Sequence, residues 1–177
     1  RRDVAFLVLG TTLATNAVLE GKWARTGVIT TAGFRDVLEL ARQRRPHYFN
    51  LDIPKPMPPA PRDCRLEVSE RVAQDGSVVT PLVEDDVRRA VAVLKTKQVE
   101  AVAICFMHAY ANADHEARVR ALVKSLWPEI YLCTSSEVLG EFREFERFST
   151  ATVNASLMPI MDYALSQFEK GVAELGI

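Results

Sequence analysis

Apolar and polar positions along the chain follow two periods, one typical of strands and the other typical of helices. Strands are predicted at 4–9, 26–30, 101–107 and 130–133, and the runs at 4–9 and 101–107 are continuously apolar, as in strands covered on both faces. Between them, apolar residues recur every three or four positions in segments that begin near residues 12, 34, 84 and 114. Strands that alternate with helices favour an α/β fold with a mostly parallel sheet and flanking helices.

The last third of the chain is predicted to be helical, which gives the α/β fold a helical C-terminal end. The helical spacing begins at about Glu144 and is found again from Met161 to Leu175. Pro159 lies between these two stretches. Because proline lacks a backbone N–H and its ring crowds the preceding turn, we expect it to break or kink the helix.

Residues 42–64 interrupt the alternation of strands and helices. Six of the nine prolines define an irregular segment at 46–61, namely Pro46, Pro54, Pro56, Pro58, Pro59 and Pro61. Proline fixes φ and has no donor, so this segment is predicted to be extended and irregular. Beyond it, the apolar positions within 66–72 and at 78–79 flank Asp75-Gly76, which predicts a hairpin.

Composition describes an ordinary globular chain and excludes several classes of function. The 177 residues are 48% hydrophobic and 25% charged, with 22 Lys and Arg against 23 Asp and Glu. A net charge of −1 gives no overall field to recruit nucleic acid or an anionic membrane. No stretch reaches the roughly 18 apolar residues that would span a bilayer. We therefore expect partners other than nucleic acid or membrane.

The cysteines indicate a reducing compartment. There are three, Cys64, Cys105 and Cys133, with wide spacing and no C-x-x-C. Two of them lie in apolar runs, where a thiol behaves as a small hydrophobic group. We expect a reduced, cytoplasmic protein. Because the sequence starts without Met and directly on a predicted strand, we also expect it to be part of a longer subunit.

The first candidate for chemistry follows the first predicted strand. Gly10, Thr11 and Thr12 precede a predicted helix that carries Thr15 and Asn16 in its first turn. Free backbone N–H groups, hydroxyls and an amide in this arrangement can bind an anion. The alternative is an ordinary helix N-cap, which the residue types alone favour. The chain contains neither G-x-x-x-x-G-K-[ST] nor G-x-G-x-x-G, which argues against a self-sufficient nucleotide site of those two kinds.

The second candidate is the charged stretch 141–147, at the start of the last helix. Its charges are three residues apart and can form a solvated, salt-bridged face. However, Phe142, Phe145 and Phe148 recur every three residues, which indicates that part of this helix is buried. The polar residues that follow on the same helix are Ser149, Thr150, Thr152 and Asn154. A polar network at a cleft is therefore the competing interpretation.

The histidines form a third and weaker candidate. His108 and His115 follow the carboxyl end of the strand at 101–107, where ligands of open α/β sheets bind. Position 119 is Val, so there is no H-E-x-x-H, and the spacing typical of metal motifs is missing. We favour local pairing of His115 and packing of His108, and we predict no metal site.

Taken together, these segments resemble the N-terminal region of the hydantoinase A/5-oxoprolinase family. The resemblance rests on LGTTLATN at 9–16 and GVITTAGFRDVLE at 27–39, then on ERV at 70–72, VEAVA at 99–103 and HE at 115–116. It ends with RE at 143–144, ER at 146–147, ST at 149–150 and VNA at 153–155. These blocks occur in the family's order over nearly the whole chain, so residues 1–177 are identified as one domain of this type.

The resemblance implies an enzyme related to the actin-like ATPases that uses ATP and Mg²⁺. Its implied chemistry is phosphorylation of a lactam or imide carbonyl oxygen before the ring is opened, which depends on positioning and charge neutralisation. The residues implied in catalysis are Arg143, Glu144 and Arg147. Those implied in binding substrate or phosphate are Thr11, Thr12, Asn16 and Asn154.

Two departures limit what the resemblance implies. The family usually has His before Gly-Thr-Thr, and here that place holds Leu9. The family's glycine-rich phosphate loop lies upstream of the first strand and its adenosine-binding half lies downstream, so both are expected outside this sequence. The chain alone is therefore expected to show no ATPase activity.

Two functions are compatible with these residues and with the resemblance. The first is part of an ATP-dependent cyclic amide hydrolase with a small cyclic amide substrate and a second, hydantoinase B-type subunit. In that function Asn16 and Arg147 are expected to line one shared hollow. The alternative is a non-catalytic domain in a hetero-oligomeric complex such as an acetone carboxylase-like assembly, where the segment 46–61 docks a partner subunit.

Overall fold

The computed structural model describes residues 6–43, 49–50, 52–53 and 57–176. The helices are α1 (Leu13–Glu20), α2 (Val37–Leu40), α3 (Glu84–Thr96), α4 (Asp114–Leu126), α5 (Ser135–Val138) and α6 (Glu144–Glu174), with a 3₁₀ turn at Arg62–Cys64. The strands are β1 (Thr26–Thr31), β2 (Arg65–Val68), β3 (Arg71–Val72), β4 (Val78–Thr80), β5 (Ala101–Cys105) and β6 (Tyr131–Thr134). No helix in the described part of the chain is long and apolar enough to cross a lipid bilayer.

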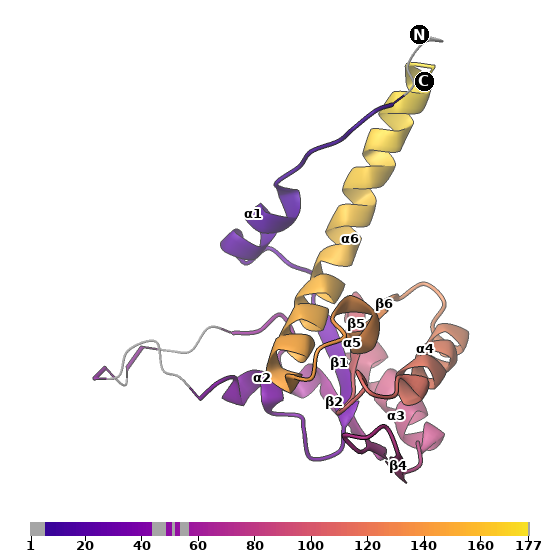
Figure 1. Ribbon diagram of the computed structural model, residues 1–177. Helices are drawn as coiled ribbons and strands as arrows, with labels where there is room; N and C mark the ends of the chain where they lie inside the picture. The colour runs from indigo at the N-terminus through magenta and orange to yellow at the C-terminus, as the bar shows by residue number, and fades with distance from the viewer. Residues whose placement is uncertain (1–5, 44–48, 51, 54–56, 177) are drawn as a thin grey trace.

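Four strands form one parallel sheet in the order β2-β1-β5-β6, which confirms the predicted α/β class (Figure 1). The register places Ile29 beside Ile104, and Ile104 beside Thr134. Strand β1 is buried at all six positions and β5 at all five, because helices cover both faces of the sheet.

The two faces of the sheet build two separate cores. Alternate strand residues, including Ile29 and Ile104, pack with the apolar stripes of α3 and α4. The residues between them, including Val28 and Ala103, pack with α2 and the first half of α6. The small side chains of β5 on this second face allow α6 to lie close to the sheet, where Phe148 is 1% exposed. Beyond the sheet, α6 continues past α1 (Figure 1).

Two predictions about individual strands are corrected by the structure. The strand at 4–9 is wrong for its described part, because Phe6–Leu9 are exposed and have no strand beside them, whereas Val4 and Ala5 lie outside the described residues. The hairpin is confirmed for β3 and β4, but Arg65–Val68 pairs in parallel with β1 and belongs to the main sheet. Apolar alternation alone does not reveal which partner a strand chooses.

Of the break or kink predicted at Pro159, the break is wrong, because α6 runs through this residue without interruption. The missing N–H removes one helical hydrogen bond. However, α6 packs on the sheet before Pro159, and Pro159 itself lies opposite α1 in an apolar groove. These contacts hold the helix together on both sides of the proline.

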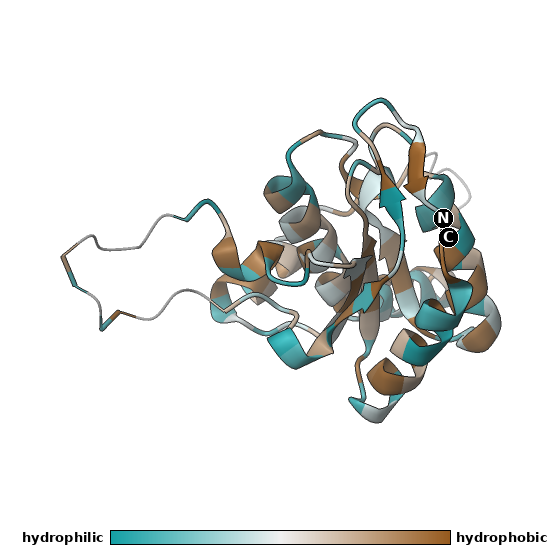
Figure 2. Cartoon of the chain, turned by 90° about the horizontal axis from the view of Figure 1, so that it is seen from below, coloured by the Kyte–Doolittle hydropathy of each residue, from teal (hydrophilic) through white to brown (hydrophobic). Residues whose placement is uncertain are grey.

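The proline-rich segment lacks regular structure in its described parts, as predicted. Figures 1 and 2 both show the described residues 49–50 and 52–53 far from the sheet. Phe49 and Met57 are exposed there. The chain returns to the body of the molecule at Ala60, which is buried.

Candidate functional site

All four parallel strands end at the same edge of the sheet, and polar side chains gather there. Thr31 ends β1, Glu70 follows β2, and Ser135 follows β6. All three are buried. The helix α4, which follows β5, adds His115 and Glu116 from its first turn, and both are buried. Ligands of open α/β sheets bind at this edge, so it is the candidate functional site.

Glu116 is the centre of the larger of two hydrogen-bond networks at this edge. Its Oε1 accepts hydrogen bonds from the backbone N–H of Phe106 (2.9 Å) and from the hydroxyl of Ser135 (2.6 Å). Its Oε2 accepts the backbone N–H (2.9 Å) and the hydroxyl (2.6 Å) of Ser136. Four donors therefore surround a carboxylate that is 1% exposed, so both of its oxygens are satisfied without water. Glu116 thus links the loops after β5 and β6.

Arg147 joins the same two loops to the start of α6. Its side chain is 0% exposed, and its three nitrogens donate to Ser135 Oγ (3.2 Å), the Glu141 carbonyl (2.6 Å) and the Phe106 carbonyl (2.9 Å). Ser135 therefore lies between the cation and Glu116. Burial lowers the pKa of Arg147, and the negative charge of Glu116 acts in the opposite direction. The structure shows Arg147 as a buried cross-link of the site.

A second network connects β1 and β2 to the loop after β5. Glu70 Oε2 lies 2.8 Å from His115 Nδ1, and Glu70 Oε1 accepts the hydroxyl of Thr31. The same Thr31 oxygen accepts the backbone N–H of Met107 at 2.9 Å. His115 and Glu116 thus project from one helical turn to opposite sides of β5, one toward β2 and the other toward β6.

The other residues predicted at the start and middle of α6 lie nearer the surface. Arg143 is exposed, and its guanidinium lies 5.7 Å from the ring of Phe142. Glu144 is exposed in the first turn of α6. Asn154 is exposed on the same helix and interacts with the Cys133 thiol. Of the three residues predicted to be catalytic, the structure places only Arg147 in the buried network, and the catalytic roles of all three stay predictions.

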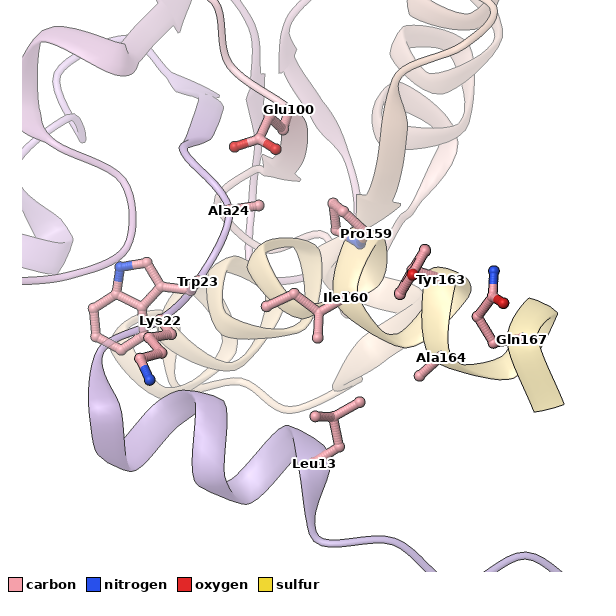
Figure 3. A pocket seen from close by; sticks show the side chains of 10 residues that line it. All are labelled: Leu13, Lys22, Trp23, Ala24, Glu100, Pro159, Ile160, Tyr163, Ala164 and Gln167. Carbon is pink, nitrogen blue, oxygen red and sulfur yellow. The ribbon is translucent and has the colours of Figure 1, made fainter.

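The residues predicted to bind phosphate lie elsewhere. Thr11 Oγ1 accepts the backbone N–H of Leu13 at 3.1 Å, and Thr12 Oγ1 accepts the side-chain amide of Asn16 at 3.4 Å. Both hydroxyls thus bond locally at the start of α1, although the N-cap Thr12 makes no side-chain capping hydrogen bond. The helix α1 lies along the second half of α6, across an apolar groove of about 730 Å³ that Leu13, Trp23, Pro159, Ile160 and Tyr163 help to line (Figure 3).

This arrangement separates the two predicted groups. Arg147 precedes Ile160 by 13 residues on a continuous helix, which corresponds to about 20 Å along its axis. The structure does not bring Asn16 and Arg147 into one hollow, because α1 follows the distal half of α6 and Arg147 lies beneath the sheet edge. Within the described residues, the candidate site consists of the network at the sheet edge.

The histidines do not lie in a common site. His108 adopts a left-handed φ of 56°, and its Nδ1 lies 2.9 Å from the carbonyl of Val72. This contact fixes the loop after β5 to the hairpin, while His115 pairs with Glu70. Among the described residues, no group of three His, Cys, Asp or Glu side chains could hold a metal ion.

The three cysteines are buried, and their thiols are expected to react slowly. Burial raises the pKa of Cys133 to about 11 and raises that of Cys105 well above its ordinary value. Burial, assisted by Asp63, also raises the pKa of Cys64. Because the thiolate is the reactive form, a raised pKa lowers its population at pH 8. Titration with a disulfide reagent should modify the native cysteines at least ~100-fold more slowly than those of the unfolded chain; equal rates would contradict the burial of these groups.

Sequence reasoning missed most of the network. Neither Glu70 nor Glu116 is singled out by a motif of its own, and Ser135 reads as an ordinary turn residue. A usable signal is present, because Glu70 follows a strand within two residues and Glu116 lies in the first turn of the helix that follows another strand. Charged residues at such positions lie at the ligand-binding edge whenever the strands are parallel.

Comparison with known proteins agrees with this fold. A family model described as the hydantoinase/oxoprolinase N-terminal region matches residues 1–127. An uncharacterized protein of Methanocaldococcus jannaschii is 38% identical over 93% of the chain and 25% of its own length. The alpha subunit of caprolactamase from Pseudomonas jessenii is 34% identical over 98% of the chain and 25% of the relative. The 5-oxoprolinase of Saccharomyces cerevisiae is 30% identical over 97% of the chain and 15% of the relative.

A crystal structure of the ATP-dependent caprolactamase from Pseudomonas jessenii has the same fold over most of the chain. It superposes with a TM-score of 0.88 over 94% of this chain and 24% of that structure, at 34% identity. The chain therefore belongs to the hydantoinase/oxoprolinase family, and it corresponds to the N-terminal region of that family. It spans about a quarter or less of the length of these relatives.

Proposed function

We propose that the chain is part of an enzyme that uses ATP to open a cyclic amide. The observation that carries this proposal is the likeness to ATP-dependent caprolactamase, at 34% identity with a TM-score of 0.88. In the proposed reaction, ATP transfers its γ-phosphoryl group to the carbonyl oxygen of the ring and leaves as ADP. One water then adds to this carbon and the C–N bond breaks, which gives the amine and an acyl phosphate, and a second water hydrolyses the acyl phosphate to the carboxylate and inorganic phosphate. The products are the ring-opened amino acid, ADP and inorganic phosphate, so the reaction balances.

The described residues do not by themselves fit a complete nucleotide site. No cluster of metal-ligating side chains occurs among them, and the four acceptor positions of Glu116 are already occupied by donors. In this proposal, parts of the protein outside this chain hold ATP and Mg²⁺. The role of the sheet-edge network is to fix the loops after β5 and β6 relative to α6, and Arg143 and Glu144 provide exposed charge beside it.

The proposal is tested on the native full-length protein with its partner subunit. We expect one of 5-oxoproline, caprolactam or hydantoin to yield its ring-opened product together with an equal amount of inorganic phosphate. The product is measured by chromatography, with and without ATP. Ring opening that does not need ATP, or no product from any of the three compounds, would contradict the proposal.

Two variants test whether the exposed charge of Arg143 contributes to this reaction. Arg143→Ala should lower turnover, whereas Lys170→Ala, at the exposed far end of α6, should not. Wild-type turnover in Arg143→Ala would remove Arg143 from the site and leave the overall activity intact.

A second candidate function is docking of a partner subunit through the segment 46–61. It is favoured by the exposed Phe49 and Met57, which lie on described parts of that segment. Deleting 46–61 should abolish co-purification of the partner subunit in this case. Unchanged assembly would eliminate this function.

A further inference from the structure

Two buried arginine nitrogens are the only buried side-chain polar atoms without a hydrogen-bond partner in the described part of the chain. They are Arg35 Nε and Arg71 Nη1. A buried polar group without a partner is rare in folded proteins and calls for an explanation, such as an ion or ligand that completes it. The two atoms belong to the same kind of group, and both need an acceptor.

Both arginines lie at the edge of the sheet where the strands end. Arg35 follows β1 by four residues, and Arg71 follows β2 by three. Since β1 and β2 are neighbouring parallel strands, their carboxyl ends and the turns that follow lie side by side. Phe34 connects the two, because it precedes Arg35 in the chain and its ring lies 4.7 Å from the Arg71 guanidinium carbon.

The charge around these arginines is not balanced. Glu67 is the carboxylate nearest to Arg35, with 2.8 Å from Nη2 to Oε2, and its other oxygen accepts the backbone N–H of Gly33. No described carboxylate lies within ion-pair distance of Arg71. Glu70, next to it in the chain, bonds Thr31 and His115 instead. One positive charge therefore stays uncompensated.

The stacking contact prepares Arg71 to bind a ligand. A guanidinium that lies over an aromatic ring can still donate hydrogen bonds from its N–H groups to an acceptor at its edge. Arginine binds carboxylates and phosphates through two parallel N–H···O bonds, which no apolar or cationic ligand can provide. The chemistry of an acceptor for both nitrogens is thus that of an oxyanion.

We propose that Arg71, with Arg35 beside it, forms an oxyanion-binding site at the carboxyl ends of β1 and β2. The ligand is a phosphate or carboxylate group bound by the edge of the Arg71 guanidinium. The inference concerns binding alone and does not depend on the proposed ring opening.

The test is isothermal titration calorimetry of the native full-length protein with inorganic phosphate and, separately, with acetate, at constant ionic strength. We expect saturable binding of one probe, and about tenfold or greater weakening in Arg71→Gln. Arg88→Gln is the matched control, because Arg88 is an exposed arginine of α3 that pairs with Glu84 and Asp85. Its affinity should equal that of the wild type.

The two probes separate the two sources of the oxyanion. Binding of phosphate alone points to a phosphoryl group, and binding of acetate alone points to a carboxylate of the substrate or of a protein partner. Superimposable isotherms for wild type and Arg71→Gln, or no saturation of the wild type by either probe, would overturn the site.

A second variant covers loss of folding. If circular dichroism shows that Arg71→Gln is unfolded, the test is repeated with Arg71→Lys, because lysine keeps the charge but cannot form a bidentate pair with an oxyanion. It should weaken binding several-fold, and unchanged affinity would again overturn the proposal. If the native protein binds an oxyanion here but opens none of the three cyclic amides, that result would count against the proposed function only.

Discussion

Arg147→Ala should lower the free energy of unfolding by about 3–5 kcal/mol, the cost typical of removing one partner from a buried ionic group. The substitution removes the guanidinium donors of the Phe106 and Glu141 carbonyls, although the Phe106 carbonyl keeps the backbone N–H of Ala109 at 3.4 Å. It also removes the positive charge nearest the buried carboxylate of Glu116 in this network. Equilibrium urea denaturation, followed by circular dichroism, measures the effect.

Two further variants establish that burial, and not charge alone, sets the size of this effect. Arg143→Ala, four residues earlier and exposed, should change stability by less than about 0.5 kcal/mol. Arg147→Lys keeps the charge but cannot reach three separate acceptors. Its loss of unfolding free energy should therefore lie between those of Arg147→Ala and Arg143→Ala. If Arg147→Ala were as stable as Arg143→Ala, the buried hydrogen bonds of Arg147 would not exist in the folded protein.

The success of the sequence prediction follows the strength of the local pattern. The strand β5 and the helices α3 and α4 could be predicted because apolar spacing and helix-start chemistry agree, as in the acidic first turn of α3. The segment 6–9 has the same apolar character as β5, yet it has no strand beside it among the described residues. A strand forms only where it can pair with another strand, and the sequence of one segment does not show which strand that is.

The candidate site likewise could not be predicted in full, because the sequence does not show which side chains meet in space. Arg143, Glu144 and Arg147 form a group in the sequence because they are close together, but only Arg147 faces the sheet. The partners of Arg147 come from residues 106, 135 and 141, and those of Glu70 come from residues 31 and 115. Such networks depend on the order of strands in the sheet, which periodicity does not reveal.

The exposed side chains of Phe49 and Met57 and the apolar groove beside α1 fit a chain that covers a small share of its relatives' length. The groove lies at the opposite end of the strands from the polar network, because Ala24 and Glu100, which line it, precede β1 and β5. The two ends of the sheet therefore differ in chemistry, one buried and polar and the other apolar and open. Contacts with further protein are expected at the second end.

Glu116→Gln should lower the free energy of unfolding by about 2–3 kcal/mol, although glutamine has almost the same shape as glutamate. Each oxygen of Glu116 faces one backbone N–H and one hydroxyl. An amide nitrogen placed on either side meets a backbone donor that cannot rotate away, so one buried N–H loses its acceptor. The loss of charge also removes the favourable field at Arg147. Urea denaturation again measures the change.

The matched control is Glu129→Gln, at an exposed position after α4, which should leave stability unchanged within about 0.5 kcal/mol. Ser135→Ala removes the hydroxyl shared by Glu116 and Arg147 and should cost about 1 kcal/mol. Because the three side chains form one connected network, the double variant Glu116→Gln with Arg147→Ala should lose less stability than the sum of the single variants. Strict additivity would mean that the two residues act independently and that Ser135 does not couple them.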